Sequence, residues 1–390
     1  MENSTGTHLN KMTEVFIVSD NIFSPIGKNT AENFARLSKS GSGLKVHDNP
    51  VLSAQPFCAS LFEDSTVVLE DELNDQYTKF EQLLIASIKD ALQNSGIDTR
   101  SDKTILIISS TKGNISLLET GTRSYESDQR IALHSSAKLV AEYFQFVTRP
   151  LVVSNACISG LLAILTGKRL IESGQYQNAV IAGADIISKF VLSGFQSFQA
   201  LSSDPCKPFD ADRNGINLGE GAATVILSSN KKYSNDNVKI TGGSVSNDAN
   251  HISGPSRTGE ELYQAIRNAL KQSSLTAEDI GFISAHGTAT IYNDEMEAKA
   301  ITLAGMKSIP VNSLKGYYGH TLGAAGIIES VVSIHSLKQG LVLPSKGFNK
   351  PGITKPVNIC STLQTGSYNN CLKTASGFGG CNAALVFSKQ

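Results

Sequence analysis

The sequence predicts an α/β protein whose sheets are largely buried. Short apolar runs rich in Val and Ile alternate with longer segments in which apolar residues recur at the helical period. Strands that read as near-continuous apolar runs are typical of sheets covered on both faces. At 390 residues, the chain is long enough for one large two-part domain or two ordinary ones, with a core that needs no staples.

The elements of the first half follow one another in a regular order. An apolar run predicts a first strand, and a helix-period segment follows it: EVFIVSD (14–20) and FEQLLIASIKDALQNSG (80–96). Two further apolar runs predict strands on either side of a long connection: TILIISS (104–110) and PLVVSN (150–155). After them we expect a helix that begins near Cys157, and then two more strands: NAVIAGADII (178–187) and ATVILS (223–228).

The second half repeats this pattern. The segment GEELYQAIRNALKQSSLTAEDIGFISAHG resembles KFEQLLIASIKDALQNSGIDTRSDKTILIISSTKG, and GGCNAALVF resembles GEGAATVIL, in the same order along the chain. An internal duplication predicts one half at residues 13–235 and the other at 236–390. Chance similarity between α/β segments is the alternative. Because active sites often form where similar halves meet, we expect catalytic groups from both.

Composition excludes several classes of protein. With 40% hydrophobic residues, 18% charged residues and a net charge of −1, the chain is not predicted to bind nucleic acid or to be disordered. We expect no membrane span, because no apolar run reaches about 18 residues. We expect no signal peptide, because MENSTGTHLNK has neither a basic start nor an apolar stretch. The six cysteines are widely spaced without a CxxC pair. This usage predicts a reduced, cytoplasmic protein without a metal site.

Cys157 lies where an apolar strand meets an apolar helix, in VVSNACISGLL. We expect Ser154 or Asn155 to cap this helix, which would place Cys157 in its first turn. Unsatisfied N–H groups and the helix dipole favour a thiolate there, so the sequence suggests a nucleophile. The alternative is an inert buried thiol.

Two histidines stand beside glycines at predicted strand ends. His286 occurs in FISAHGTAT and His320 in VNSLKGYYGHTLGAAGIIES, with Lys315 five residues upstream. A thiol with two imidazoles suggests covalent catalysis with two hydrogen-bond donors for a developing negative charge. A cysteine protease would instead pair one histidine with an Asn or Asp.

Taken together, these segments resemble the condensing enzymes of fatty-acid and polyketide synthesis, the β-ketoacyl-acyl-carrier-protein synthases. The likeness runs from about Thr13 to the end and rests on motifs in family order: VFIVSDNIFSPIGKN, SNACISG, PFDADRNGINLGEGAA, AHGTATIYNDEMEAKA, LKGYYGHTLGAAGIIES and SGFGGCNAALVF. The resemblance implies the thiolase fold, a duplicated five-layer αβαβα sandwich.

The resemblance also implies roles for individual residues. Cys157 would accept the acyl group, and His286 and His320 would complete a Cys-His-His triad. Lys315 would organise the electrostatics of the site, with Glu329 as its buried partner.

The GFGG motif, Gly377 to Gly380, resembles the family's gating loop. Phe378, between Gly377 and Gly379, would block the acyl pocket and offer its N–H to the oxyanion hole. Thr288 would lie close to the pantetheine arm.

As a family member, the chain would condense malonyl carrier protein with an acyl group on Cys157, losing CO2. The resemblance implies no cofactor beyond the phosphopantetheine of acyl carrier protein. It implies a homodimer, or a heterodimer with a chain-length-factor-like subunit. The segments SNACISG, SKFVLSGFQSFQALS and HGTATIYNDEMEAKA most resemble those of ketosynthases from aryl-polyene or related pigment clusters.

Three alternatives remain. A thiolase acting on coenzyme A thioesters would use Cys381 as a second catalytic cysteine. A non-catalytic, chain-length-factor-like subunit would have lost the nucleophile or a histidine. A hydrolase would release the acyl group from Cys157 without malonyl.

Overall fold

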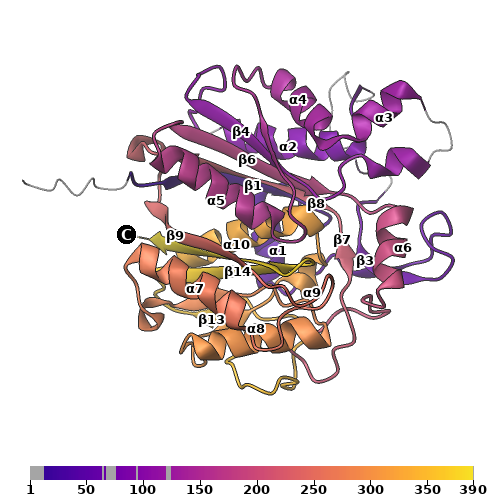
Figure 1. Cartoon of the computed structure of the whole chain (residues 1–390), viewed down its shortest axis with the longest axis vertical. Coiled ribbons are helices and arrows are strands. Elements are labelled where there is room, and N and C mark those ends of the chain that lie inside the picture. Colours follow the sequence, from indigo (N-terminus) through magenta and orange to yellow (C-terminus); the bar gives the residue numbers. More distant parts are fainter. Residues whose placement is uncertain (1–12, 64–65, 67–75, 94, 120–123, 390) are drawn as a thin grey trace, which may run out of the picture.

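The computed structural model describes residues 13–63, 66, 76–93, 95–119 and 124–389 (Figure 1). The strands of its large sheet are β1 (Phe16–Phe23), β4 (Thr104–Ser109), β5 (Leu151–Val153), β6 (Asn178–Asp185), β8 (Gly221–Ser228), β9 (Val238–Asn247), β10 (Phe282–Ser284), β11 (Val311–Asn312), β14 (Asn370–Gly377) and β15 (Cys381–Lys389). Short strands form two small sheets: β2 (Lys45–His47), β3 (Phe57–Ser60) and β7 (Leu218–Gly219) in one, β12 (Leu341–Val342) and β13 (Gln364–Thr365) in the other.

The helices alternate with these strands along the chain. They are α1 (Thr30–Ser38), α2 (Lys79–Gln93), α3 (Tyr125–Ile131), α4 (Leu133–Tyr143), α5 (Ser159–Glu172), α6 (Lys189–Ser197), α7 (Glu260–Ser273), α8 (Ile291–Leu303), α9 (Lys315–Tyr318) and α10 (Ala325–Gln339). The predicted α/β alternation is therefore confirmed. None of the helices in the described ranges is long and apolar enough to cross a bilayer.

The large sheet repeats one strand order twice. From one edge to the centre, the first half runs β5-β4-β6-β8-β1. From the opposite edge to the centre, the second half runs β11-β10-β14-β15-β9, so β5 corresponds to β11 and β1 to β9. In each half the strands corresponding to β5, β4 and β6 are parallel, and the next two are antiparallel. The two halves of the sheet thus share order and direction. The boundary between residues 235 and 236 stays a prediction.

Helices cover both faces of each half of the sheet. α2 packs on β1, β6 and β8, and α7 packs on β9 and β15, at opposite outer faces of the molecule (Figure 1). Between the two halves, α5 and α10 pack against each other, and each contacts strands of both halves. The order of layers is therefore helix, sheet, helix, sheet, helix.

The halves meet along a narrow seam and a shared core. Phe16 of β1 pairs with Lys239 of β9, and the Ile240 N–H donates to the Val15 carbonyl at 3.0 Å. One apolar cluster contains residues of α5 and α10 together with strands of both halves, whereas two other clusters belong mainly to one half each. The shared cluster brings the end of β5 close to the ends of β10 and β11.

Candidate active site

Cys157 lies on a sharp turn between β5 and α5. The preceding residue, Ala156, has a φ of +43°, in the left-handed region that side chains other than glycine rarely adopt. The Ser159 hydroxyl accepts a hydrogen bond from the Asn155 N–H at 2.7 Å and donates one to the Ala156 carbonyl at 2.6 Å. These bonds hold the turn and so fix the direction of the Cys157 side chain.

The helix after Cys157 begins later than predicted. α5 starts at Ser159, and Ile158 at its N-cap position makes no side-chain cap. The predicted caps, Ser154 and Asn155, are wrong, because the Ser159 hydroxyl itself bonds the turn. Cys157 therefore precedes the helix instead of lying in its first turn.

Cys157 is half-buried at the cavity, and desolvation of its thiol by the surrounding protein raises the pKa to about 12. Cys381 raises the pKa further, whereas Lys315, Lys112 and the Phe378 backbone N–H lower it. The expectation of a resting thiolate is wrong, because desolvation outweighs the charges. Near neutral pH the side chain is a neutral thiol that loses its proton only as the sulfur reacts.

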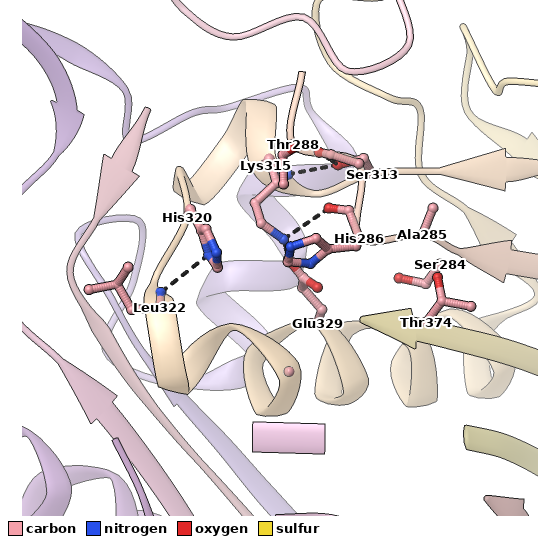
Figure 2. A network of polar contacts seen from close by, with 12 residues as sticks. Ser284, Ala285, His286, Thr288, Ser313, Lys315, His320, Leu322, Glu329 and Thr374 are labelled. Carbon is pink, nitrogen blue, oxygen red and sulfur yellow. Dashed lines mark hydrogen bonds and ion pairs between the residues drawn. The ribbon is translucent and has the colours of Figure 1, made fainter. Parts of the chain in front are cut away.

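His286 follows β10 and is held through its backbone. Its N–H donates to Glu297 Oε1 at 2.8 Å, and its carbonyl accepts from Lys315 Nζ at 3.0 Å (Figure 2). The next residue, Gly287, donates to the other Glu297 oxygen at 2.6 Å, and the Thr288 N–H donates to Asp294 at 2.9 Å. The ring is free of these bonds, and its Nδ1 is buried with no hydrogen-bond partner among the described residues.

His320 lies between α9 and α10, and one contact of its ring defines the tautomer. The Leu322 N–H donates to its Nδ1 at 3.2 Å, so Nδ1 carries the lone pair and Nε2 carries the proton (Figure 2). That Nε2 is buried, and no residue in the described part of the chain accepts its hydrogen. His320 therefore offers an unused N–H donor.

The thiol and the two imidazoles converge at one point. The ligand atoms of Cys157, His286 and His320 all lie within 4.8 Å of one another, and the two rings meet edge to face with centroids 5.2 Å apart. Burial lowers the pKa of both histidines well below the ordinary value of 6.5, and Lys315 lowers it further. Both rings are therefore neutral. The absence of a metal site stays a prediction.

A buried ionic network lies beneath the histidines. Lys315 and Glu329, both predicted to support the site, form an ion pair and are 0% and 3% exposed. The network contains another cation that the prediction missed: Lys373 of β14 lies 2.7 Å from Glu329 Oε2 and is fully buried. A lysine inside the apolar strand segment CLKTASG was the available signal, since buried lysines are rare unless paired.

A cavity of about 450 Å³ opens onto the triad. Its lining includes Cys157, His286 and His320, with Thr288 on one side. The predicted gating residue Phe378 lines it too, stacked on Phe195 with ring centroids 6.0 Å apart and edge-on to Phe198 at 5.3 Å. Three aromatic rings thus form one wall beside the nucleophile.

The loop of Phe378 approaches Cys157 closely because its neighbours are small. A Cβ at Gly377 would lie 2.9 Å from Cys381 Sγ and 3.0 Å from the Cys157 backbone nitrogen, so only glycine fits. Gly379 has a φ of +84° and donates its N–H to the Ile252 carbonyl at 2.7 Å. This geometry directs the Phe378 N–H at the Cys157 sulfur.

Cys381 lies outside the cavity, although it is near Cys157. It is 4% exposed, it packs in the shared apolar core, and its Sγ donates to the Phe378 carbonyl at 3.4 Å. All six cysteines are free thiols.

Comparisons with known proteins agree with this site. Residues 12–232 match the family described as "Beta-ketoacyl synthase, N-terminal domain", and residues 238–349 match "Beta-ketoacyl synthase, C-terminal domain". Among relatives, 3-oxoacyl-[acyl-carrier-protein] synthase 2 of Vibrio cholerae is 30% identical over 80% of this chain and 82% of its own length. The corresponding synthase 2 of Rhizobium meliloti is 34% identical, over 61% of this chain and 60% of its own length.

A solved structure covers nearly the whole chain. The ketosynthase ApeO in complex with its chain length factor ApeC, from Xenorhabdus doucetiae, matches with a TM-score of 0.85 and 25% identity over 97% of this chain and 98% of that one. The predicted thiolase fold, ketosynthase resemblance and condensing-enzyme class are confirmed. The chain belongs to the β-ketoacyl synthase family.

Proposed function

We propose that Cys157, His286 and His320 carry out the family's decarboxylative condensation in this chain. The observation that carries the proposal is the convergence of one neutral thiol and two neutral imidazoles within 4.8 Å at a cavity of about 450 Å³. Each neutral imidazole carries one N–H, and this N–H can donate a hydrogen bond to a forming oxyanion and so stabilise it.

The first half-reaction loads the acyl group. The Cys157 sulfur attacks the thioester carbonyl of acyl carrier protein, a new C–S bond forms, and the carrier's C–S bond breaks. The thiol proton ends on the released phosphopantetheine sulfur. The backbone N–H groups of Cys157 and Phe378 would hold the carbonyl oxygen while it is negatively charged.

The second half-reaction extends the chain. Malonyl carrier protein loses CO2, and the electron pair of the broken C–C bond becomes an enolate whose oxygen accepts hydrogen bonds from His286 and His320. The enolate carbon attacks the acyl-Cys157 thioester, and its C–S bond breaks. The product is a β-ketoacyl carrier longer by two carbons. Because malonyl leaves its carboxylate as CO2, the released Cys157 thiolate takes its proton from water.

No group beyond the phosphopantetheine of the carrier is needed for these steps, so we propose that the enzyme uses no additional cofactor. Thr288 lines the cavity and would contact the pantetheine arm. The six free thiols support a cytoplasmic location.

We further propose an aryl or polyene primer. Phe195, Phe198 and Phe378 line the cavity together with Cys157, and the ring of Phe378 packs on the other two. A planar, conjugated acyl group would stack on such a wall, whereas a saturated chain would gain only apolar burial.

Pairing with a second subunit is part of the proposal. β5 is an edge strand of the large sheet in the described part of the chain, and its Leu151 is 38% exposed. An unpaired edge invites pairing with another chain. The ApeO complex is the precedent for a chain length factor as that partner, and a second copy is the alternative.

The thiolase alternative is less favoured, because the thiol of Cys381 bonds the Phe378 carbonyl and does not line the cavity. The non-catalytic alternative is disfavoured because the thiol and both imidazoles are present.

The test is acylation followed by intact mass. Wild-type protein and Cys157→Ala are mixed with carrier-bound saturated, polyene and aryl acyl groups. We expect a gain of one acyl group only in wild type, greatest with polyene or aryl groups, and its discharge by malonyl carrier to β-ketoacyl carrier. Acylation by coenzyme A thioesters alone would instead support the thiolase, and release without malonyl would support the hydrolase.

A further inference from the structure

The buried lysine of β14 occupies a position that links the parts of the active site. We propose that Lys373 is a positioning residue for the condensation, acting on His286 and His320 through Glu329 and the end of β10. The inference rests on the proposed function, because it concerns the same two histidines.

The contacts of Lys373 use all the donors of its ammonium group. Nζ donates to the carbonyls of Thr374 at 2.7 Å, Ser284 at 3.2 Å and Ala285 at 3.3 Å, and it lies 2.7 Å from Glu329 Oε2. An ammonium group has three N–H bonds, and these donate to the three carbonyls, so the contact with Glu329 Oε2 is an ion pair without a hydrogen bond. Such a fully partnered cation fixes the atoms around it.

Those atoms belong to three elements of the site. Ser284 and Ala285 directly precede His286, as Figure 2 shows. Glu329 lies on α10, the helix that follows His320, and β14 itself leads into the Phe378 loop. Lys373 therefore contacts both the residues that precede His286 and the carboxylate on the helix that follows His320. The Nζ of Lys315 donates to the carbonyl of His286 and to the other oxygen of Glu329.

The network contains charged groups of both signs. The ammonium groups of Lys315 and Lys373 share the carboxylate of Glu329, and Glu297 places a second carboxylate against the backbone of His286. The ionisable groups that surround the two histidines from the neighbouring elements are Cys157, Asp185, Cys206, Asp294, Glu297, Lys315, Glu329 and Lys373. Lys373 is among the cations that lower the pKa of both rings, after burial and Lys315.

The test is the pH dependence of malonyl-carrier decarboxylation in Lys373→Met. Lys373→Met removes one positive charge that disfavours protonation of the two rings, so the histidines take up protons at higher pH. We expect the acidic limb of the profile to move up by about one pH unit and the rate at the acidic end to fall about tenfold. The double variant Lys373→Met/Glu329→Gln removes one cation and one carboxylate and so keeps the wild-type net charge of the network, so its acidic limb should return toward the wild-type position.

Two controls separate this role from loss of packing. Lys168→Met removes another buried lysine, which is 2% exposed and lies 2.5 Å from Glu172 near the C-terminal end of α5. This variant should lower the melting temperature without moving the pH profile of decarboxylation. Alkylation of Cys157 by iodoacetamide should keep its pH dependence in Lys373→Met, because that thiol responds to Lys315 and Lys112.

The outcomes are distinct. A folded Lys373→Met protein with an unchanged acidic limb would overturn the proposal, as would a double variant whose limb moves further upward. If Lys373→Met does not fold, the double variant alone decides. A folded double variant whose acidic limb lies at the wild-type pH supports the proposal, and an acidic limb at another pH refutes it. A wild type that neither accepts acyl groups nor decarboxylates malonyl carrier would overturn the proposed function itself.

Discussion

At the scale of single residues, one hydrogen bond sets the role of His320. Because the Leu322 N–H occupies Nδ1, the proton on Nε2 is the one available to a substrate oxygen. We expect His320→Ala to slow malonyl-carrier decarboxylation by about 10²–10³-fold, as loss of an oxyanion donor does. Loading of Cys157 should persist, since that step uses backbone N–H groups. Carbon dioxide release and intact mass measure the two steps separately, and equal loss of both would contradict this division.

The histidines also make a prediction about pH. Their pKa values lie below 6.5 in the folded protein because the rings are buried, so imidazolium forms only at lower pH. The decarboxylation rate should therefore hold steady as the pH falls through 6.5 and decline only below it.

As the pH falls, stability should respond to the same titration earlier than the rate does. Below 6.5 the unfolded chain binds protons at these histidines that the folded protein excludes, so unfolding becomes easier as the pH falls. Urea unfolding at a series of pH values measures this slope. His320→Ala should reduce it, and an unchanged slope would show that the ring is already protonated in the folded state.

Individual residues differ in how far the sequence predicts them. Cys157 and His286 are recognisable because each follows a strand and has small residues beside it. The strand end predicted for His320 is wrong, because α9 separates it from β11, but the glycines around it still mark the position. The protonation of Cys157 was not predictable, since it depends on how much protein surrounds the sulfur. Lys373 was missed because its partner Glu329 is distant in sequence, and only the packing of α10 against β14 brings them together.

At the scale of elements, the crossing of α5 and α10 depends on Gly160. A Cβ there would lie 2.8 Å from the Ile327 backbone nitrogen and 2.9 Å from the Gly323 carbonyl oxygen, and backbone atoms cannot move aside cheaply. We expect Gly160→Ala to destabilise the protein by about 1–3 kcal/mol through overpacking. Chemical denaturation of both proteins measures the difference.

Gly194 in α6 provides the matched control. A Cβ there would meet no atom within 4 Å, and the residue is helical. Gly194→Ala should therefore stabilise the protein by about 0.5–1 kcal/mol, because alanine loses less entropy on entering a helix. Equal effects of the two substitutions would argue against close packing at the crossing.

Most elements follow from periodicity alone. The apolar runs and helical segments of the sequence coincide with β1, α2, β4, β5, β6 and β8, because burial on both faces of a sheet leaves a strong apolar signal. The start of α5 does not follow from it. Ser154 and Asn155 have the right chemistry for a cap, but Ser159 takes the bond, and this depends on the positive φ of Ala156.

At the scale of the whole molecule, the shared core predicts cooperative unfolding. α5 contacts β9 and β15 of the second half, and α10 contacts β1 and β8 of the first, so neither half buries its inner helix alone. We expect a single transition in calorimetry that coincides with loss of circular dichroism. Tyrosine fluorescence supplies a third probe, since the chain has no tryptophan. Two separate transitions would instead indicate independent halves.

The repeated strand order places Cys157 and His320 at corresponding points. Within the described residues, each follows the third strand of the large sheet in its half and precedes the inner helix, α5 or α10. Under the predicted internal duplication, one position of the repeat would have diverged into a cysteine in the first half and a histidine in the second. Two different side chains thus occupy corresponding positions of one repeated framework.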